Sequence, residues 1–169
     1  MSEPFDPASV HRLLLARGLS VAVAESLTGG LLSAALTESP GSSETFRGGL
    51  VVYATDLKAA LAGVPEAMLQ AEGPVSAVVA VALAGGVRQR LGTDLGLGIT
   101  GVAGPDPVDA HPAGTVFIAV AGKGTIEVRR AELSGSRAEI RAQGVCAALD
   151  LLVNVLGGQR VKAQRRPQG

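Results

Sequence analysis

Several features are scarce in this chain of 169 residues, and each scarcity excludes a class of protein. A single cysteine, Cys146, excludes an intramolecular disulfide framework and suits a reducing compartment. There is no tryptophan, and only one tyrosine and three phenylalanines, so the core must consist of alanine, valine and leucine. Fifteen basic and fifteen acidic residues balance, so no charge excess favours nucleic acid or an anionic membrane as a partner.

Long apolar segments and metal-ligand clusters are also lacking. The longest apolar run, Val75 to Val87, is too short and too rich in alanine and glycine to span a bilayer. The first residues, MSEPFDPASVHRLLLARG, show no basic-then-apolar secretion signal, and we expect a cytoplasmic protein without membrane contact. His11 and His111 have no cysteine or carboxylate cluster at ligand spacing, so we predict no metal and no cofactor.

The residues that are abundant predict one α/β domain. Apolar residues make up 47% of the chain, enough for a sizeable core, and 23 glycines indicate tight turns and close backbone packing. We expect a single domain over residues 1–160, followed by a flexible basic tail at residues 161–169. The order of elements predicts a three-layer α/β/α sandwich with a mixed, mostly parallel sheet.

The expected elements follow from apolar periodicity and from helix end signals. Expected strands cover Ser20–Ala24, Gly49–Ala54, Leu95–Thr100, Gly114–Ala121 and Thr125–Leu133, the last two joined as a hairpin. Expected helices run from Asp6-Pro7 to Gly18, over Thr28–Glu38 and Asp56–Ala62, from Gly73 to about Leu91, and over Ser134–Leu156. Polar residues at Pro40–Arg47 predict a turn region.

The first candidate site is the segment ESLTGG, residues 25–30, between an expected strand and an expected helix. Such a turn points a side chain into the crevice at the carboxyl end of a strand. Its two glycines let backbone N–H groups approach a ligand, and the helix amino terminus favours an anion. Ser26 is therefore a candidate nucleophile or hydrogen-bond donor, unless Ser26 or Thr28 only caps the helix.

The second candidate site contains Tyr53 and Lys58 in VVYATDLKAAL. If Thr55 or Asp56 caps the next helix, Lys58 falls in its first turn, where the helix dipole and burial both lower the pKa of a lysine. A lysine that is partly neutral can act as a base toward a serine hydroxyl. The alternative is a solvated surface lysine. Glu25 either orients Lys58 or its own loop, or is a surface charge.

Two further segments are suited to binding an anion. The loop GITGVAGP contains Thr100, Gly101, Ala103 and Gly104, and small residues expose backbone N–H groups for a phosphate or an oxyanion, unless they form only a tight turn. Arg137 and Arg141 lie four residues apart on one helix face and predict a phosphate or carboxylate partner, unless both are merely solvated.

Taken in order, these segments resemble one protein family. The series is ESLTGG, GGLVVYATDLKAALAGV, GPVSAVVAVALAGG, GITGVAGP, PAGTVFIAV and SRAEIR. It is similar to the carboxy-terminal domain of the competence/damage-inducible protein CinA, from about His11 to Leu156. The resemblance implies a nicotinamide-nucleotide amidase, which hydrolyses the carboxamide of nicotinamide mononucleotide to nicotinic acid mononucleotide and ammonia in pyridine-nucleotide salvage.

The resemblance also implies roles for individual residues. Ser26 corresponds to the nucleophile, and Lys58 and Tyr53 to the other catalytic residues. The predicted substrate-binding residues are Thr28, Gly29, Gly30, Thr100, Gly101, Ala103, Gly104, Arg137 and Arg141.

Three departures from the family pattern concern the ligand-facing surface. Leu27 replaces a usual cysteine, Gly135-Ser136 replaces Gly-Asp, and residues 106–112 lack a glycine cluster and are about one residue shorter. Two alternatives therefore stay open: a nucleotide- or partner-binding domain without catalysis, and an amidase for another pyridine or purine ribonucleotide. Wide apolar arcs on Val75–Leu91 and on the last helix predict a homo-oligomer.

Overall fold

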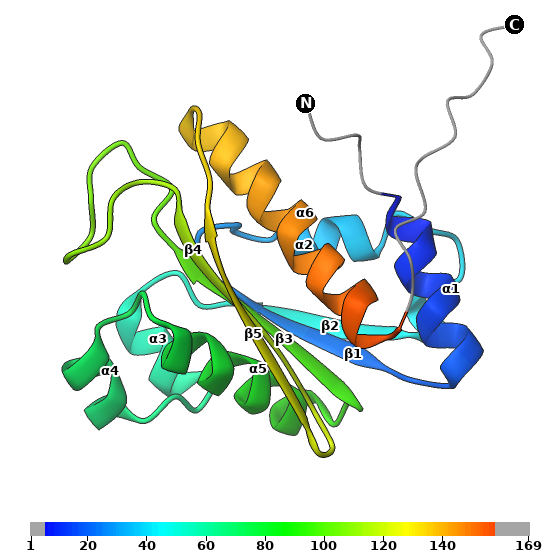
Figure 1. The fold of residues 1–169 in the computed structure, drawn as a ribbon. Helices are drawn as coiled ribbons and strands as arrows, with labels where there is room; N and C mark the ends of the chain where they lie inside the picture. Colours follow the sequence, from blue (N-terminus) through cyan, green and yellow to red (C-terminus); the bar gives the residue numbers. More distant parts are fainter. Residues whose placement is uncertain (1–5, 158–169) are drawn as a thin grey trace, which may run out of the picture.

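The computed structural model describes residues 6–157 as a five-stranded sheet between two layers of helices (Figure 1). The strand order is β2-β1-β3-β4-β5. The strands are β1 (Val21–Glu25), β2 (Phe46–Val51), β3 (Leu95–Gly101), β4 (Thr115–Gly122) and β5 (Thr125–Glu132). β1 pairs in parallel with β2 and β3, whereas β4 is antiparallel to both β3 and β5. Four strands thus share one direction, which confirms the predicted mixed, mostly parallel sheet.

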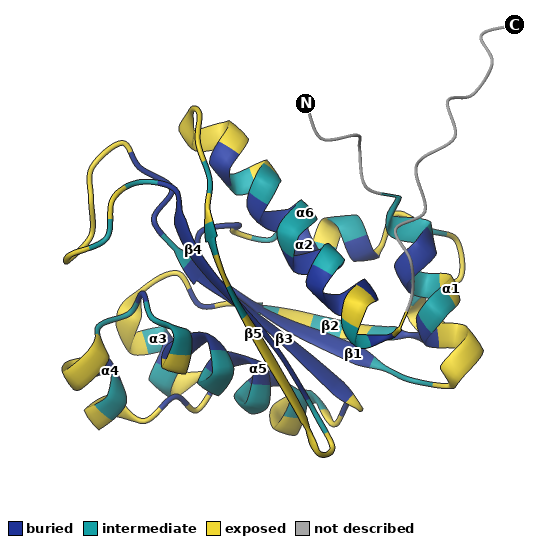
Figure 2. Cartoon of the chain, in the orientation of Figure 1, coloured by how far each residue is buried: buried dark blue, intermediate teal, exposed yellow. Residues whose placement is uncertain are grey.

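The helices divide between the two faces of this sheet (Figure 1). One face carries α1 (Pro7–Arg17), α2 (Leu31–Leu36) and α6 (Arg137–Val155), and the other carries α3 (Thr55–Ala60), α4 (Glu66–Glu72) and α5 (Ala77–Leu91). A short 3₁₀ helix, η1 (Ser42–Glu44), precedes β2. The central strands are buried between the layers, while β5 is largely exposed (Figure 2).

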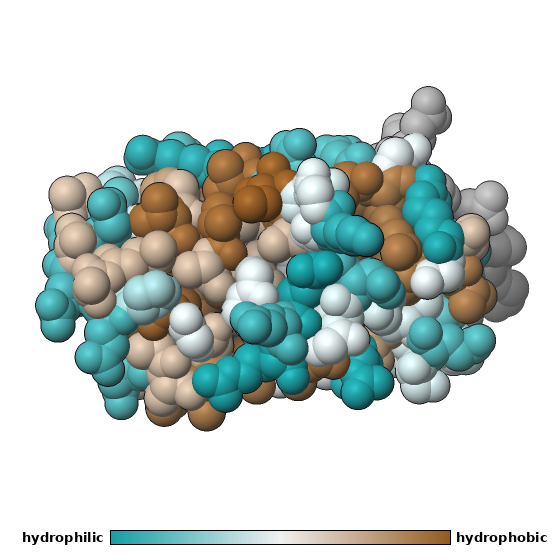
Figure 3. Space-filling view, turned by 90° about the horizontal axis from the view of Figure 1, so that it is seen from below, coloured by the Kyte–Doolittle hydropathy of each residue, from teal (hydrophilic) through white to brown (hydrophobic). Residues whose placement is uncertain are grey.

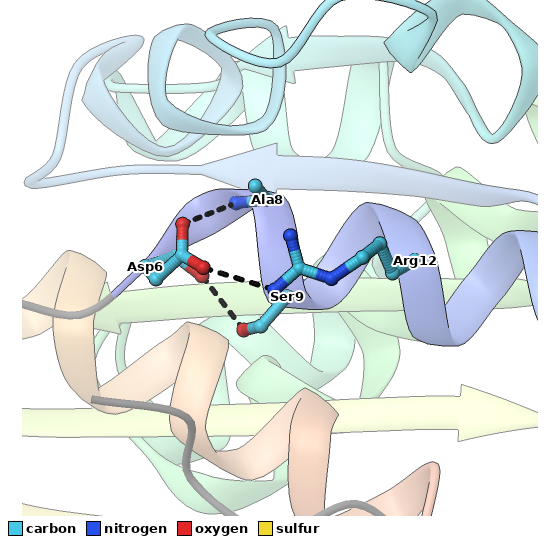
Figure 4. A network of polar contacts seen from close by, with 4 residues as sticks. All are labelled: Asp6, Ala8, Ser9 and Arg12. Carbon is cyan, nitrogen blue, oxygen red and sulfur yellow. Dashed lines mark hydrogen bonds and ion pairs between the residues drawn. The ribbon is translucent and has the colours of Figure 1, made fainter. Parts of the chain in front are cut away.

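The helix ends follow from local sequence. The Asp6 carboxylate accepts from the Ala8 N–H at 3.0 Å and from Arg12 at 3.1 Å, and the Ser9 hydroxyl donates to the Asp6 carbonyl (Figure 4). These contacts satisfy backbone and side-chain groups at the start of α1. α6 begins with a reciprocal capping box between Ser136 and Glu139.

α5 approaches β3 closely because two glycines of that strand face it. Gly96 and Gly98 alternate with Leu95, Leu97 and Ile99, which enter the core on the α6 side. A Cβ atom at Gly96 would lie 1.9 Å from the Ala84 carbonyl oxygen. The glycines thus remove the side-chain layer that normally separates helix from sheet, and α5 seats directly on the strand.

The topology leaves a crevice at the carboxyl end of β1. The chain reaches β2 from β1 by way of α2 on one face, and reaches β3 from β2 by way of α3, α4 and α5 on the other face. Where successive connections leave a parallel sheet on opposite faces, the strand ends are open to a ligand. Ser26 follows β1 directly and lies in this place.

Several predicted boundaries were wrong. α2 covers six residues rather than Thr28–Glu38, because Gly29 and Gly30 have positive φ angles of 57° and 104° and prolong the turn. β2 begins at Phe46, within the predicted polar turn, and ends at Val51, so Tyr53 lies beyond it. The last helix begins at Arg137 rather than Ser134.

Two elements were missed or misplaced in the segment after β2. α4 was not predicted, because only Leu69 of its seven residues is buried and its apolar pattern is weak. α3 begins after Ala54, so neither Thr55 nor Asp56 is its cap, and Lys58 is the fourth of its six residues.

The described residues do not extend over the whole predicted domain of residues 1–160, and the predicted tail at residues 161–169 lies outside them. Over residues 6–157, no helix has the length and hydropathy needed to cross a bilayer. The face that carries α3, α4 and α5 shows apolar patches between polar side chains (Figure 3). Leu61, which follows α3, and Val78 of α5 are among the exposed apolar residues here.

Substitution of Gly96 by alanine tests the close contact between α5 and β3. We expect Gly96→Ala to lower the free energy of unfolding by about 2–4 kcal/mol, since the methyl group meets backbone that cannot move aside. Gly85→Ala is the matched control within α5, because its Cβ meets no atom within 4 Å, and helix propensity should raise stability by about 0.5–1 kcal/mol. Urea denaturation of both variants measures the difference, and equal effects would contradict the packing argument.

Candidate active site

Ser26 and Lys58 meet at the carboxyl end of the sheet. The Lys58 Nζ atom lies 3.2 Å from the Ser26 Oγ atom, although the residues are 32 positions apart. β1 delivers Ser26 and the first turns of α3 deliver Lys58. Lys58 is 1% exposed, which rules out the alternative of a solvated surface lysine.

Burial shifts the acid–base equilibrium of Lys58. Loss of solvent around the amine lowers its pKa from 10.5 to about 8, and the nearby Asp56 carboxylate opposes the shift. About half of the amine is therefore deprotonated at pH 8, and about a tenth of it at pH 7. A base with a pKa close to the working pH is what proton abstraction from a hydroxyl requires.

Two backbone carbonyls direct the amine at the serine. Lys58 Nζ donates to the Val52 carbonyl at 2.9 Å and to the Tyr53 carbonyl at 3.3 Å. In the neutral state, an amine has two N–H bonds for these two carbonyls, and its lone pair is then left for the Ser26 hydroxyl. Neither carbonyl was foreseen, because a backbone acceptor carries no residue-type signal.

Ser26 does not serve as a helix cap. The residue at the N-cap position of α2 is Gly30, which has no side chain with which to cap the helix. Thr28 instead donates its hydroxyl to Glu25 at 2.7 Å. The alternative of a capping serine or threonine is therefore wrong for this turn.

Glu25 organises the turn that presents Ser26. Its carboxylate is fully buried and accepts from the Thr28 hydroxyl, from the Leu32 and Ser33 N–H groups, and from the Ser33 hydroxyl. Of the three roles considered for Glu25, the structure supports orientation of its own loop, because none of these bonds goes to Lys58.

A pocket of about 470 Å³ opens beside the Ser26–Lys58 pair. Its volume falls in the usual range for small-molecule sites. The predicted residues that line it are Ser26, Tyr53, Lys58, Thr100, Gly101, Ala103, Gly104 and Arg137. Val102 and Pro105 of the GITGVAGP loop and Asp106, Pro107 and Val108 of the predicted ligand-facing segment also line it, and the remaining lining residues are Leu27, Thr55, Pro74 and Val75.

Arg137 connects two walls of the pocket. It donates to the Gly104 carbonyl and, at 3.0 Å, to the Tyr53 hydroxyl, which is otherwise exposed. The Thr100 hydroxyl is turned away to the Pro74 carbonyl at 2.8 Å and joins β3 to the segment before α5. The guanidinium of Arg137 thus lies at the pocket with its position fixed by neighbouring loops.

Four predicted binding residues do not line the pocket. Thr28, Gly29 and Gly30 belong to the turn behind Ser26, and Arg141 donates to the Leu27 carbonyl at 2.9 Å and to the Thr28 carbonyl at 3.3 Å. The guanidinium of Arg141 is therefore bound to backbone carbonyls, although Arg141 shares a helix face with Arg137. Helical spacing places two residues on one face but does not reveal what each one meets.

Among residues 6–157, no group of three histidine, cysteine, aspartate or glutamate side chains is arranged to hold a metal ion. The polar side chains that line the pocket include the Ser26 hydroxyl, the Lys58 amine and the Arg137 guanidinium.

A three-layer α/β domain with a buried Ser–Lys pair at the open end of its sheet defines the class of this protein. Its sequence matches the CinA C-terminal domain family over residues 6–156, and the chain belongs to that family.

Curated relatives of this chain are longer proteins. A CinA-like protein of Frankia casuarinae is 51% identical over 146 residues, which cover 86% of this chain and 34% of that protein. A CinA-like protein of Geobacter sulfurreducens is 46% identical over 145 residues, 85% of this chain and 35% of that protein. The chain thus spans about a third of the length of the curated relatives it matches.

Solved structures of similar length share the fold. A CinA superfamily protein from Klebsiella pneumoniae superposes with a TM-score of 0.87 at 32% identity, covering 89% of this chain and 95% of that one. A competence/damage-inducible protein from Agrobacterium tumefaciens gives 0.83 at 34% identity, covering 93% and 99%. These similarities support the α/β architecture and the family membership together.

The lowered pKa of Lys58 predicts a specific pH dependence of stability. Between about pH 8 and 10.5, the unfolded chain binds a proton that the folded chain does not, so stability rises with pH across that window. Relative to Lys58→Met, the wild-type free energy of unfolding should rise by about 3 kcal/mol across that window and stay level below it. Denaturant unfolding of both proteins from pH 6 to 10.5 measures this, and parallel curves would contradict a lowered pKa.

Proposed function

We propose that this domain is an amidohydrolase that converts nicotinamide mononucleotide to nicotinic acid mononucleotide and ammonia. The observation that carries the proposal is the 3.2 Å contact between Lys58 Nζ and Ser26 Oγ at the wall of a pocket. A serine beside a partly neutral lysine is suited to acyl transfer, and a primary carboxamide is an acyl donor that releases ammonia. Family membership supports the same reaction class.

The reaction proceeds in two halves without a metal or cofactor. Neutral Lys58 removes the Ser26 proton as Ser26 Oγ bonds to the carboxamide carbon and the carbonyl electrons move to oxygen. The C–N bond then breaks, the leaving nitrogen takes the proton from Lys58, and ammonia departs. Water attacks the ester in the second half, again with Lys58 as base, which releases the carboxylic acid and regenerates Ser26.

The pocket offers partners for the rest of the substrate. Arg137 is the cation at its wall and suits the 5′-phosphate, which a planar guanidinium binds through paired hydrogen bonds. Gly101, Ala103 and Gly104 supply a wall without long side chains against which a ring or ribose can lie. The carbonyl of Tyr53 orients Lys58, and the hydroxyl of Tyr53 accepts from Arg137 and so helps to hold that guanidinium at the pocket.

The segment of residues 106–112 supports a second candidate, a domain that binds a nucleotide or a partner without catalysis. Val108 and His111 form an isolated antiparallel β-bridge, and the turn between them contains Asp109 with a φ angle of 51°. Asp106, Pro107 and Val108 line the pocket, so this departure from the family pattern contacts whatever binds. Binding of the mononucleotide in a calorimeter without ammonia release by the intact protein would favour this candidate.

Ammonia release from nicotinamide mononucleotide tests the amidase. We expect Ser26→Ala and Lys58→Ala each to reduce kcat by at least about 10³-fold, since one removes the nucleophile and the other its base. The wild-type kcat should increase with pH, reach half its maximum near pH 8, where half of Lys58 is neutral, and level off at higher pH. Ser43→Ala and Lys123→Ala, both on exposed residues away from the pocket, are the controls. Activity of the Ser26 or Lys58 variant close to wild type would rule out the Ser–Lys mechanism.

We also propose self-association, through β5. The apolar arcs of α5 and α6 that suggested an oligomer pack against the sheet, whereas Ile126 and Val128 on edge strand β5 are 63% and 47% exposed. A second copy paired antiparallel about Val128 would place Glu127 of each copy opposite Arg129 of the other.

Sedimentation measures this association directly. We expect the wild-type protein to sediment as a dimer and Val128→Lys to sediment as a monomer, because two lysines would then meet at the two-fold axis. A variant that sediments like the wild type would place the contact elsewhere.

A further inference from the structure

Two buried N–H groups next to Ser26 lack an acceptor. Within residues 6–157, neither the Leu27 N–H nor the Thr28 N–H donates to another group, and Leu27 and Thr28 are 3% and 0% exposed. The N–H groups on either side are used: that of Ser26 donates to Ile99 and that of Gly29 to the Ser26 carbonyl, both at 3.1 Å. Buried donors without partners are rare, and here they directly follow the candidate nucleophile; Leu27 lines the pocket, whereas Thr28 does not.

The carbonyls of the same peptides show where these N–H groups point. In a trans peptide the C=O and N–H bonds are antiparallel, and only Gly104-Pro105 is cis among the described residues. The Leu27 carbonyl faces Arg141, so the Thr28 N–H points away from α6. The Ser26 carbonyl faces Gly29 inside the turn, so the Leu27 N–H points out of the turn.

Arg141 fixes this arrangement. Its Nε and Nη2 atoms hold the Leu27 and Thr28 carbonyls, and a Cβ atom at Gly29 would lie 3.2 Å from Nη2, so the guanidinium packs against the turn. Arg141 is absent from the ion pairs found in the described part of the chain.

We propose that the Leu27 N–H group, on a residue that lines the pocket, is an oxyanion donor for Ser26, and that Arg141 is the positioning residue that holds Leu27 in place through its carbonyl. This inference rests on acyl transfer at Ser26. When Ser26 Oγ bonds to the carbonyl carbon, the carbonyl electron pair moves to oxygen, which accepts from the Leu27 N–H group while the Ser26 proton passes to Lys58. When the C–N bond breaks, that pair reforms the carbonyl and ammonia leaves with the proton from Lys58.

This role differs from the expectation that Arg141 binds the substrate phosphate. A phosphate ligand acts in substrate binding and matters only when the phosphate is present. A residue that orients oxyanion donors acts in the transition state and matters equally for any acyl donor. Kinetics with and without the phosphate therefore separates the two roles.

The first experiment measures ammonia release by Arg141→Met and Arg141→Lys from nicotinamide mononucleotide and from nicotinamide riboside, which lacks the phosphate. We expect kcat of Arg141→Met to fall about 10- to 100-fold on both substrates, with KM within about 3-fold of wild type. Arg141→Lys, which keeps the cation, should recover part of kcat. An increase in KM confined to the mononucleotide would overturn the inference in favour of phosphate binding.

The second experiment does not depend on the natural substrate. p-Nitrophenyl acetate acylates a serine nucleophile with release of nitrophenolate, and mass spectrometry of wild type and Ser26→Ala identifies acetyl-Ser26. We expect acylation at least about 10-fold slower in Arg141→Met and unchanged in Arg47→Met, a control that also removes an arginine bond to a backbone carbonyl, that of Leu91, away from the pocket.

The two experiments distinguish failure of this inference from failure of the proposed function. Acylation of Ser26 that depends on Arg141, without hydrolysis of the mononucleotide, would support the oxyanion hole and contradict the amidase. Acylation at the wild-type rate in Arg141→Met, or no acylation of Ser26 in the wild type, would overturn the oxyanion hole. Thermal unfolding of each variant confirms that the comparison is made between folded proteins.

Discussion

The site depends on one amine that is kept out of water without a counter-ion. Lys58 is almost fully buried, and within the described residues its Nζ atom contacts a hydroxyl and two carbonyls but forms no ion pair with a carboxylate. A paired carboxylate would raise the pKa of the amine and hold it in its charged form, which has no lone pair to accept a proton. Dipolar carbonyls orient the amine without neutralising it, so burial remains the dominant influence on its pKa. The chain thus accepts an unfavourable buried charge where a base is needed.

The sheet provides the geometry that this amine requires. The Val52 N–H donates to the Glu25 carbonyl at 2.8 Å, so the chain just after β2 stays paired with the end of β1. This pairing brings the Val52 carbonyl next to the turn that carries Ser26, and Lys58 reaches both from α3. Glu25 fixes the same turn from the side of α2. The positions of nucleophile and base therefore follow from strand register, which a rigid sheet determines better than a loop could.

The sequence was sufficient to predict the architecture. The order of its motifs also identified Ser26, Tyr53 and Lys58 as candidate catalytic residues. Apolar runs and capping residues located the strands and the long helices, because those signals are local. α4 and the start of β2 were missed, since a largely exposed helix and an edge strand show weak periodicity.

The details of the site could not be predicted for a different reason. The acceptors of Lys58 and of Arg141 are main-chain carbonyls, which every residue possesses, so no residue type identifies them. The spacing of Arg137 and Arg141 correctly indicated a shared helix face but could not show that one meets the pocket and the other the back of the turn. Only the three-dimensional arrangement separates them.

α6 has a consequence for how the molecule can move. Two arginines one turn apart on a single rigid rod grip the turn after β1, the loop after β3 and the tyrosine after β2. A small slide or tilt of this rod would therefore displace three segments in concert, and none of them can drift alone without breaking a bond to it. The mouth of the pocket and the turn that carries Ser26 would therefore move together. A partner or modification that shifted the end of α6 would change substrate access and the position of the nucleophile at the same time.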